Sequence, residues 1–160
     1  MPTLDLTASS IEITRTLCDI ESVSGNEKQI ADAVEAEVSA CAHLEVFRDR
    51  DAIVARTNLG RARRVVIAGH LDTVPVNHNL PSRVEGGELI GRGTVDMKAG
   101  VAVQLKLAVE LTEPLVDVTW IWYDQEEVSA DLNGLGRLAR NRPDLLHGDF
   151  AILGEPTNAV

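Results

Sequence analysis

The sequence predicts an α/β fold of three layers, in which a twisted, mostly parallel sheet is covered by helices on both faces. Apolar runs typical of strands buried on both faces, such as 65–69, alternate with segments whose apolar residues recur at helical spacing. The 160 residues show no internal repeat and no low-complexity linker. They therefore fit one domain of ordinary size.

The first helix is expected soon after the start of the chain. Ser9 and Ser10 can cap its N-terminus, since a serine hydroxyl accepts a hydrogen bond from a free helical N–H group. The helix would carry Ile11, Leu17 and Ile20.

A second helix is predicted to follow the segment 24–27. Ser24 and Glu27 have the spacing of a capping box, in which the hydroxyl and the carboxylate satisfy N–H groups at the helix start. The helix should end near Cys41 to His43. Its apolar stripe consists of Ile30, Val34, Val38 and Cys41.

The remaining elements alternate between strands and helices. Short strands are expected at 44–48, 52–57 and 88–90, and apolar core strands at 65–69, 116–123 and 150–153. Helices are expected at 96–111 and 132–141. This alternation predicts that the core strands run parallel.

Composition and charge exclude several classes of protein. The net charge of −10, from 25 acidic and 15 basic residues, argues against a nucleic-acid partner. No apolar stretch approaches the roughly 18 to 20 residues of a membrane-spanning helix, so no membrane association is expected. The start, Met1 to Leu6, lacks a basic region followed by an apolar one, and a cytoplasmic location is expected. Cys18 and Cys41 are interpreted as buried thiols in a reducing compartment.

Acidic residues follow each of the three core strands. In open α/β sheets the carboxyl ends of the strands form the crevice that binds ligands. A further acid, at the start of the helix expected at 96–111, can point into the same crevice. The residues expected to converge are His70, Asp72, Asp96, Glu126, Glu127 and Glu155.

Five carboxylates in one crevice would repel each other unless a cation neutralised them. Imidazole together with carboxylate oxygens suits zinc, cobalt or manganese, and two ions fit better than one. His70 and Asp72 leave the same face of an extended segment, so Asp72 can hold the second N–H of the imidazole. Glu126 and Glu127 should point in different directions, one toward a metal ion and one free to accept a proton. Asp96 can bridge two ions.

Each of these features has an ordinary structural explanation when taken alone. An H-x-D sequence is common, Glu126 and Glu127 could be a solvated strand end, Asp96 could cap a helix, and Glu155 could belong to a turn before Pro156. Their joint occurrence at three consecutive core-strand ends favours the metal site.

Four stretches resemble the signatures of the acetylornithine deacetylase and succinyl-diaminopimelate desuccinylase family of zinc hydrolases. They are GHLDTVP at 69–75, GRGTVDMKAG at 91–100, DQEE at 124–127 and GEPT at 154–157, in the order and spacing of the family. The resemblance implies a zinc-peptidase-like catalytic domain with two Zn²⁺ ions, which Co²⁺ can replace. It further implies that His70, Asp96 and Glu155 hold one zinc ion, and that Asp96 and Glu127 hold the other.

The resemblance also implies the roles of the neighbouring residues. Glu126 would act as general base and acid, Asp72 would orient His70, and the peptide bond between Asp96 and Met97 would be cis. The stretches 71–76, 79–83 and 153–157 are most similar to those of desuccinylases that act on N-succinyl-LL-2,6-diaminopimelate in lysine and diaminopimelate biosynthesis. An N-acetylornithine deacetylase, an aminoacylase or a dipeptidase remains an alternative, as does a fragment without turnover.

Family members also have a second metal-binding histidine far downstream, and a separate lid and dimerisation domain. Residues 1–160 are therefore predicted to be the N-terminal part of the catalytic domain, with its C-terminal part and the lid domain outside this chain. The complete protein is expected to be a homodimer that acts on a small N-acyl amino acid, and this chain alone is expected to be inactive. His43, His78 and His147 are interpreted as surface histidines.

Overall fold

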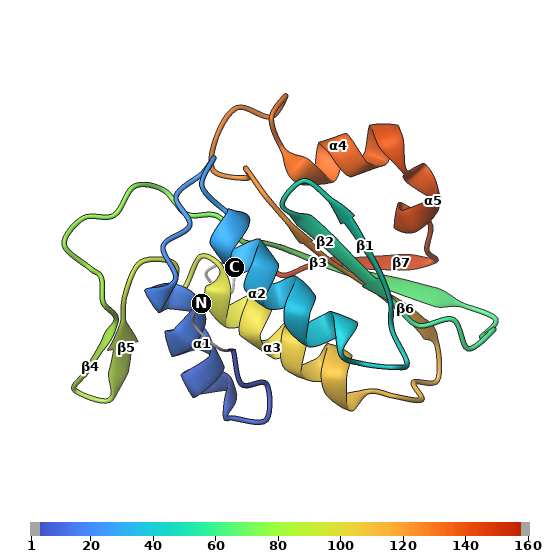
Figure 1. The fold of residues 1–160 in the computed structure, drawn as a ribbon, viewed down its shortest axis with the longest axis horizontal. Coiled ribbons are helices and arrows are strands. Elements are labelled where there is room, and N and C mark those ends of the chain that lie inside the picture. Colours follow the sequence, from blue (N-terminus) through green and yellow to red (C-terminus); the bar gives the residue numbers. More distant parts are fainter. Residues whose placement is uncertain (1–3, 158–160) are drawn as a thin grey trace.

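The computed structural model describes residues 4–157 as a five-stranded sheet between two sets of helices (Figure 1). The sheet order is β1-β2-β6-β3-β7. The strands are β1 (Glu45–Asp49), β2 (Ala52–Arg56), β3 (Arg64–His70), β6 (Asp117–Tyr123) and β7 (Phe150–Leu153). β3 pairs in parallel with β6 and β7, whereas β2 pairs antiparallel with β1 and β6. The predicted three-layer α/β fold is confirmed, and the parallel part consists of the three expected core strands.

Helices cover both faces of the sheet. The first set comprises α1 (Ser10–Asp19), α2 (Lys28–Ser39) and α3 (Lys98–Glu110), and the second comprises α4 (Gly134–Asn141) and α5 (Pro143–Leu146). A separate hairpin of β4 (Arg83–Glu85) and β5 (Glu88–Ile90) stands apart from the main sheet (Figure 1). Neither β4 nor α5 was predicted from the sequence.

The first helix begins where the sequence predicts. The hydroxyl of Ser9 accepts a hydrogen bond from the backbone N–H of Glu12, so Ser9 is the N-cap. The predicted apolar face is partly wrong, because Ile11 is 63% exposed. Leu17 and Ile20 are buried as predicted, and Ile13 is buried in place of Ile11, since it lies four residues before Leu17 on the same side of the helix.

The predicted capping box at the second helix is wrong. Glu27 occupies the N-cap position of α2 but its side chain makes no capping bond, and the hydroxyl of Ser24 donates to Asp72. The apolar stripe is confirmed for Ile30, Val34 and Val38, which are fully buried, but not for Cys41, which lies beyond the end of the helix and is half-buried. The helix ends at Ser39, slightly earlier than expected.

The core lies on both sides of the central strand β6. Trp120 and Trp122 belong to the cluster under α1 to α3, whereas Ile121 and Tyr123 belong to the cluster under α4 and α5. This alternation follows from the two-residue period of a strand. Burial on both faces fixes the register of β6, and with it the place where the chain leaves the strand.

The third core strand differs from the expectation in its burial. β7 pairs with β3 as expected, but Phe150 is 64% exposed and Leu153 is 57% exposed. β7 is an edge strand among residues 4–157, where no other strand follows it in the sheet order. β7 therefore serves mainly to position the residues that follow it, and it adds little to the core.

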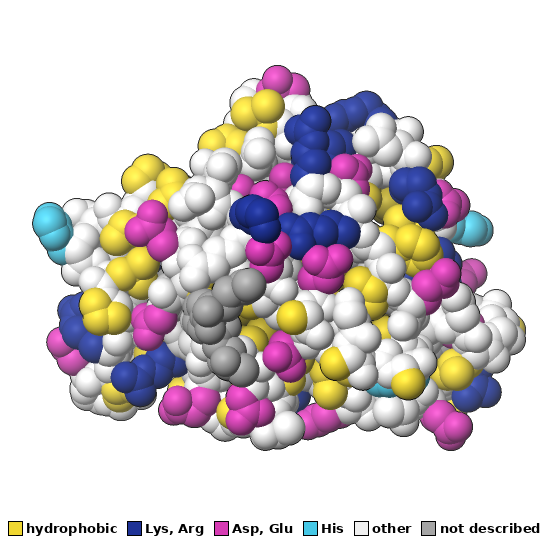
Figure 2. Space-filling view, in the orientation of Figure 1, with side chains coloured by type: hydrophobic (Ala, Val, Ile, Leu, Met, Phe, Trp, Pro, Cys, Tyr) yellow, Lys and Arg dark blue, Asp and Glu magenta, His cyan; other side chains and the backbone are white. Residues whose placement is uncertain are grey.

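Residues 1–3 and 158–160 lie outside the described part, and so does the start of the segment that was considered for a secretion signal. Among the described residues, no helix is long and apolar enough to cross a membrane. Cys18 is buried, Cys41 is half-buried, and both are free thiols. Figure 2 shows acidic and basic side chains interspersed over the face covered by α1 to α3.

Candidate metal centre

The parallel pairing of β3, β6 and β7 brings three chain segments to one edge of the sheet. His70 pairs with Tyr123 and Ala68 pairs with Leu153, so the residues that follow each strand emerge side by side. These residues carry the acids that the sequence singled out. The parallel register is therefore the reason that separate parts of the sequence meet.

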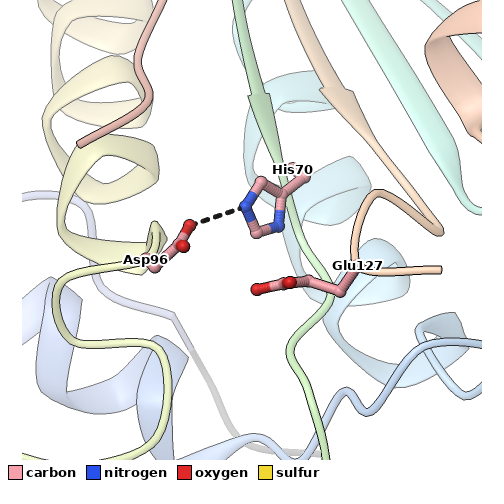
Figure 3. Close-up of side chains that lie close together, drawn as sticks. All are labelled: His70, Asp96 and Glu127. Atoms are coloured by element: carbon pink, nitrogen blue, oxygen red, sulfur yellow. Dashed lines mark hydrogen bonds and ion pairs between the residues drawn. The ribbon is translucent and has the colours of Figure 1, made fainter. Parts of the chain in front are cut away.

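Three of the predicted site residues form one compact cluster (Figure 3). One ligand atom each of His70, Asp96 and Glu127 lies within 4.8 Å of the others. The Nε2 atom of His70 is 2.9 Å from Oδ1 of Asp96. His70 is fully buried, whereas the side chain of Asp96 is 50% exposed, so the cluster has one closed side and one open side.

The geometry fits a bound metal ion. Two ligands, each about 2.1 Å from a tetrahedral zinc ion, would be about 3.4 Å apart. A separation of 2.9 Å between His70 and Asp96 needs to open by only about half an ångström for this. Glu155 lies slightly farther out, with Oε2 at 3.8 Å from Nε2 of His70. A nitrogen donor with several carboxylates is a donor set that zinc accepts.

Asp72 lies behind the cluster and contacts several groups. Nδ1 of His70 is 3.0 Å from the backbone oxygen of Asp72 and 3.4 Å from its carboxylate oxygen Oδ1. The backbone oxygen is thus the closer acceptor for the second N–H of the imidazole. The Asp72 carboxylate also accepts hydrogen bonds from the backbone N–H groups of Glu126 and Glu127, each at 3.0 Å. Asp72 is therefore linked to two of the converging segments.

The electrostatics of His70 and Asp72 reflect this network. Burial lowers the pKa of His70, but hydrogen bonds to Asp72 and Asp96 outweigh it and raise that pKa to about 9. Burial raises the pKa of Asp72, but hydrogen bonds from His70, Ser24 and two backbone amides outweigh burial and lower it. The pair therefore carries opposite charges when no metal is bound.

The outer carboxylates repel each other. Burial and the negative charge of Asp96 raise the pKa of Glu127. Burial, Asp96 and Glu126 likewise raise the pKa of Glu155, although His70 works in the opposite direction. A divalent cation would remove this repulsion, because it is the largest local charge in such a site.

Asp96 reaches the cluster from the loop that precedes α3. The peptide bond between Asp96 and Met97 is cis, as the resemblance implied. The next residue, Lys98, is buried and its ammonium group donates to the backbone oxygens of Leu17 and Ile20. The loop is thereby anchored to the end of α1. A pocket of about 460 Å³ lies between this loop and the cluster, and Arg92 and Thr73 are among its lining residues.

The structure also adds residues that the sequence did not assign to the site. Ser24 donates to Oδ2 of Asp72 at 2.6 Å, and Glu27 accepts from the backbone N–H of Gln125. Their spacing was interpreted as a capping box, and no signal in the sequence distinguished the two possibilities. His78 and His147 are exposed, and His43 is half-buried with Nε2 at 2.9 Å from the backbone oxygen of Ala108.

The sequence profile of peptidase family M20/M25/M40 matches residues 66–160 of the chain, which include all the clustered residues. The chain belongs to this family. One relative of the chain is the succinyl-diaminopimelate desuccinylase of Corynebacterium glutamicum, and the two sequences are 50% identical over 161 residues. That alignment covers 98% of the chain and 44% of the relative.

One further relative and one solved structure are similar to the chain. A Mycobacterium tuberculosis protein, whose name assigns it the same activity provisionally, is 54% identical over 96% of the chain and 44% of its own length. A crystal structure of an M20 family metallo-carboxypeptidase from Sulfolobus solfataricus superposes with a TM-score of 0.77 at 16% identity. The superposition covers 92% of the chain and 37% of that protein, and the likeness supports the fold alone. The chain thus spans less than half the length of these relatives.

Proposed function

We propose that the protein is a metal-dependent amide hydrolase that removes the succinyl group from N-succinyl-LL-2,6-diaminopimelate. The observation that carries this proposal is the cluster of His70, Asp96 and Glu127 in a chain at least 50% identical to proteins named for that reaction. Water would add to the succinyl amide carbon and the C–N bond would break. The products would be succinate and LL-diaminopimelate.

His70, Asp96, Glu127 and Glu155 are the proposed zinc ligands. Zinc, when bound, supplies a Lewis acid that makes water more acidic and an amide carbonyl more electrophilic. Two ions are proposed, and Asp96 would be a ligand of both. Nδ1 of His70 is held by Asp72, so that Nε2 points toward Asp96 and would be the atom that binds zinc. Homodimerisation of the complete protein stays a prediction.

Glu126 is the proposed general base and acid. Its backbone N–H is held by Asp72, while its side chain is not part of the metal-ligand cluster. It would take a proton from the attacking water and pass it to the departing amine nitrogen. Its charge acts within the site, since it contributes to the raised pKa of Glu155.

The test is Glu126→Gln in the native protein. The variant should bind zinc as the wild type does, and kcat should fall by about 10²- to 10⁴-fold, because the proton acceptor is lost while the shape is kept. Glu113→Gln, at an exposed position outside the site, is the matched control. Zinc content is measured by elemental analysis. Retained turnover would refute the base assignment, and lost zinc would make Glu126 a ligand.

The substrate is tested separately with the same protein. The rate with N-succinyl-LL-2,6-diaminopimelate is compared with the rates with N-acetylornithine, an N-acyl amino acid and a dipeptide. The largest kcat/KM is expected for the succinyl compound. A larger value for another of these amides would move the assignment within the family and leave the proposed metal site unchanged.

A further inference from the structure

Three consecutive backbone amides in the loop after β6 donate to buried carboxylates. The N–H of Gln125 donates to Oε1 of Glu27 at 3.1 Å, and those of Glu126 and Glu127 donate to the two oxygens of Asp72 at 3.0 Å. Gln125 has a φ of 58°, in the left-handed region. Successive N–H groups in such turns form a concave anion-binding surface, and here the anions belong to the protein itself.

Glu27 is not explained by its own helix. It is 1% exposed, and α2 begins directly after it without a capping bond from its side chain. Its Oε1 atom accepts instead from the N–H of Gly25 at 2.8 Å and from that of Gln125, which is 98 residues away in the sequence. No cation among residues 4–157 pairs with Glu27, and a buried carboxylate in that situation is costly, so these hydrogen bonds are what the position requires.

The segment that carries Glu27 is fastened to the chain beyond β3. Ser24 N–H donates to the backbone oxygen of Thr73 at 3.1 Å, and Thr73 N–H donates to that of Ser22 at 2.9 Å. The hydroxyl of Ser24 also donates to Asp72. Hydrogen bonds therefore tie the segment of Glu27 to that of Asp72. The loop that they bind carries the proposed base and a proposed zinc ligand.

We propose that Glu27 is a positioning residue, which fixes the loop 125–127 and thereby sets where the carboxylates of Glu126 and Glu127 lie. The inference rests on the proposed function for the roles of those two residues. Glu27 acts through a side-chain oxygen that is long enough to accept the N–H of Gln125, and its negative charge is not required for this. Nothing in the site requires Glu27 to touch the substrate.

Three variants of Glu27 in the native protein test this. Glu27→Ala removes the acceptor, Glu27→Asp keeps the charge but shortens the reach, and Glu27→Gln keeps an acceptor of the same reach without the charge. Amide hydrogen exchange at Gln125 should be at least about 10-fold faster in the Ala and Asp variants and within about 3-fold of wild type in the Gln variant. This readout needs neither metal nor substrate.

Zinc affinity and turnover provide the second readout. The Ala and Asp variants should lose about 10- to 100-fold in zinc affinity or kcat, with KM changed less, and the Gln variant should retain both. Asp117→Ala is the matched control. Asp117 is 3% exposed and accepts from the N–H groups of Leu59 and Arg61, each at 2.8 Å, at the opposite end of β6. The Asp117→Ala variant should have a lower melting temperature but unchanged amide hydrogen exchange at residues 125–127.

The outcomes separate the two proposals. Exchange and zinc affinity unchanged in both Glu27→Ala and Glu27→Asp would overturn the positioning role. A Gln variant as impaired as the Ala variant would also overturn it, because charge would then be what matters. If Glu27→Ala does not fold, Glu27→Asp decides, since it retains the buried charge. A wild type that neither binds zinc nor turns over would refute the proposed function, while the exchange data would still decide for or against the positioning role.

Discussion

The buried ion pair between Asp124 and Arg137 gives a sharp prediction about stability. Asp124 is 1% exposed and Arg137 is 8% exposed, and Nη2 of Arg137 is 2.6 Å from Oδ1 of Asp124. Burial lowers the pKa of Arg137, but the contacts with Asp124 and Asp49 outweigh it and raise that pKa. The pair joins α4 to the end of β6, directly before the loop that carries the proposed base.

The two partners should not be equivalent. Arg137→Met leaves Asp124 buried without its cation, which costs about 3–5 kcal/mol of unfolding free energy. Asp124→Asn costs less, about 1.5–3 kcal/mol, because Arg137 keeps its hydrogen bond to the backbone oxygen of Asp49 at 3.0 Å. For a chain of this size each kcal/mol lowers the melting temperature by about 2–4 °C. Arg137→Met should therefore melt about 6–20 °C below the wild type.

Urea denaturation of both single variants and of the double variant measures these costs. The double variant should lose less than the sum of the single costs, by about 0.5–3 kcal/mol, because the residues are in contact. Equal costs for the two single variants would refute the argument that Asp49 supports Arg137. Additive costs in the double variant would refute the ion pair itself.

Two further predictions concern packing and pH. Gly134→Ala should cost about 1–3 kcal/mol of unfolding free energy, because its Cβ would lie 2.9 Å from the backbone N and O of Asp124. In Gly136→Ala the new Cβ meets nothing closer than 3.5 Å, so this variant should stabilise α4 by up to about 1 kcal/mol. Equal effects of the two variants in thermal melts would contradict this reasoning. In metal-free protein, hydrogen bonds from His70 to Asp72 and Asp96 hold its pKa near 9 despite burial, so the stability due to its protonation is full below pH 6.5 and lost as the pH rises through about 9. Zinc at about 100 times its Kd should add about 2.7 kcal/mol to the free energy of unfolding. A melting temperature of the metal-free protein that does not change with pH would refute the assignment of His70.

Much of the fold followed from local patterns. The alternation of apolar runs with helical periodicity predicted β3, β6, β7, α3 and α4. Burial on both faces requires a continuous apolar sequence, which explains the apolar run of β6. The convergence of His70 and Glu127 followed from the rule that parallel strands end at one edge of a sheet, and that of Asp96 from its place at the start of the helix predicted at 96–111. That rule uses only the order of the elements, which the sequence contains.

The tertiary structure alone decided the partners of Ser24 and Glu27. Their spacing satisfies a capping box equally well, and a local pattern cannot reveal a partner such as Gln125, which is 98 residues away. The same holds for the exposure of β7 and for the position of Glu155 at 3.8 Å from His70, since both depend on what packs at the edge of the sheet. Residue type and spacing thus determined which side chains gather, whereas long-range hydrogen bonds determined how each one is held.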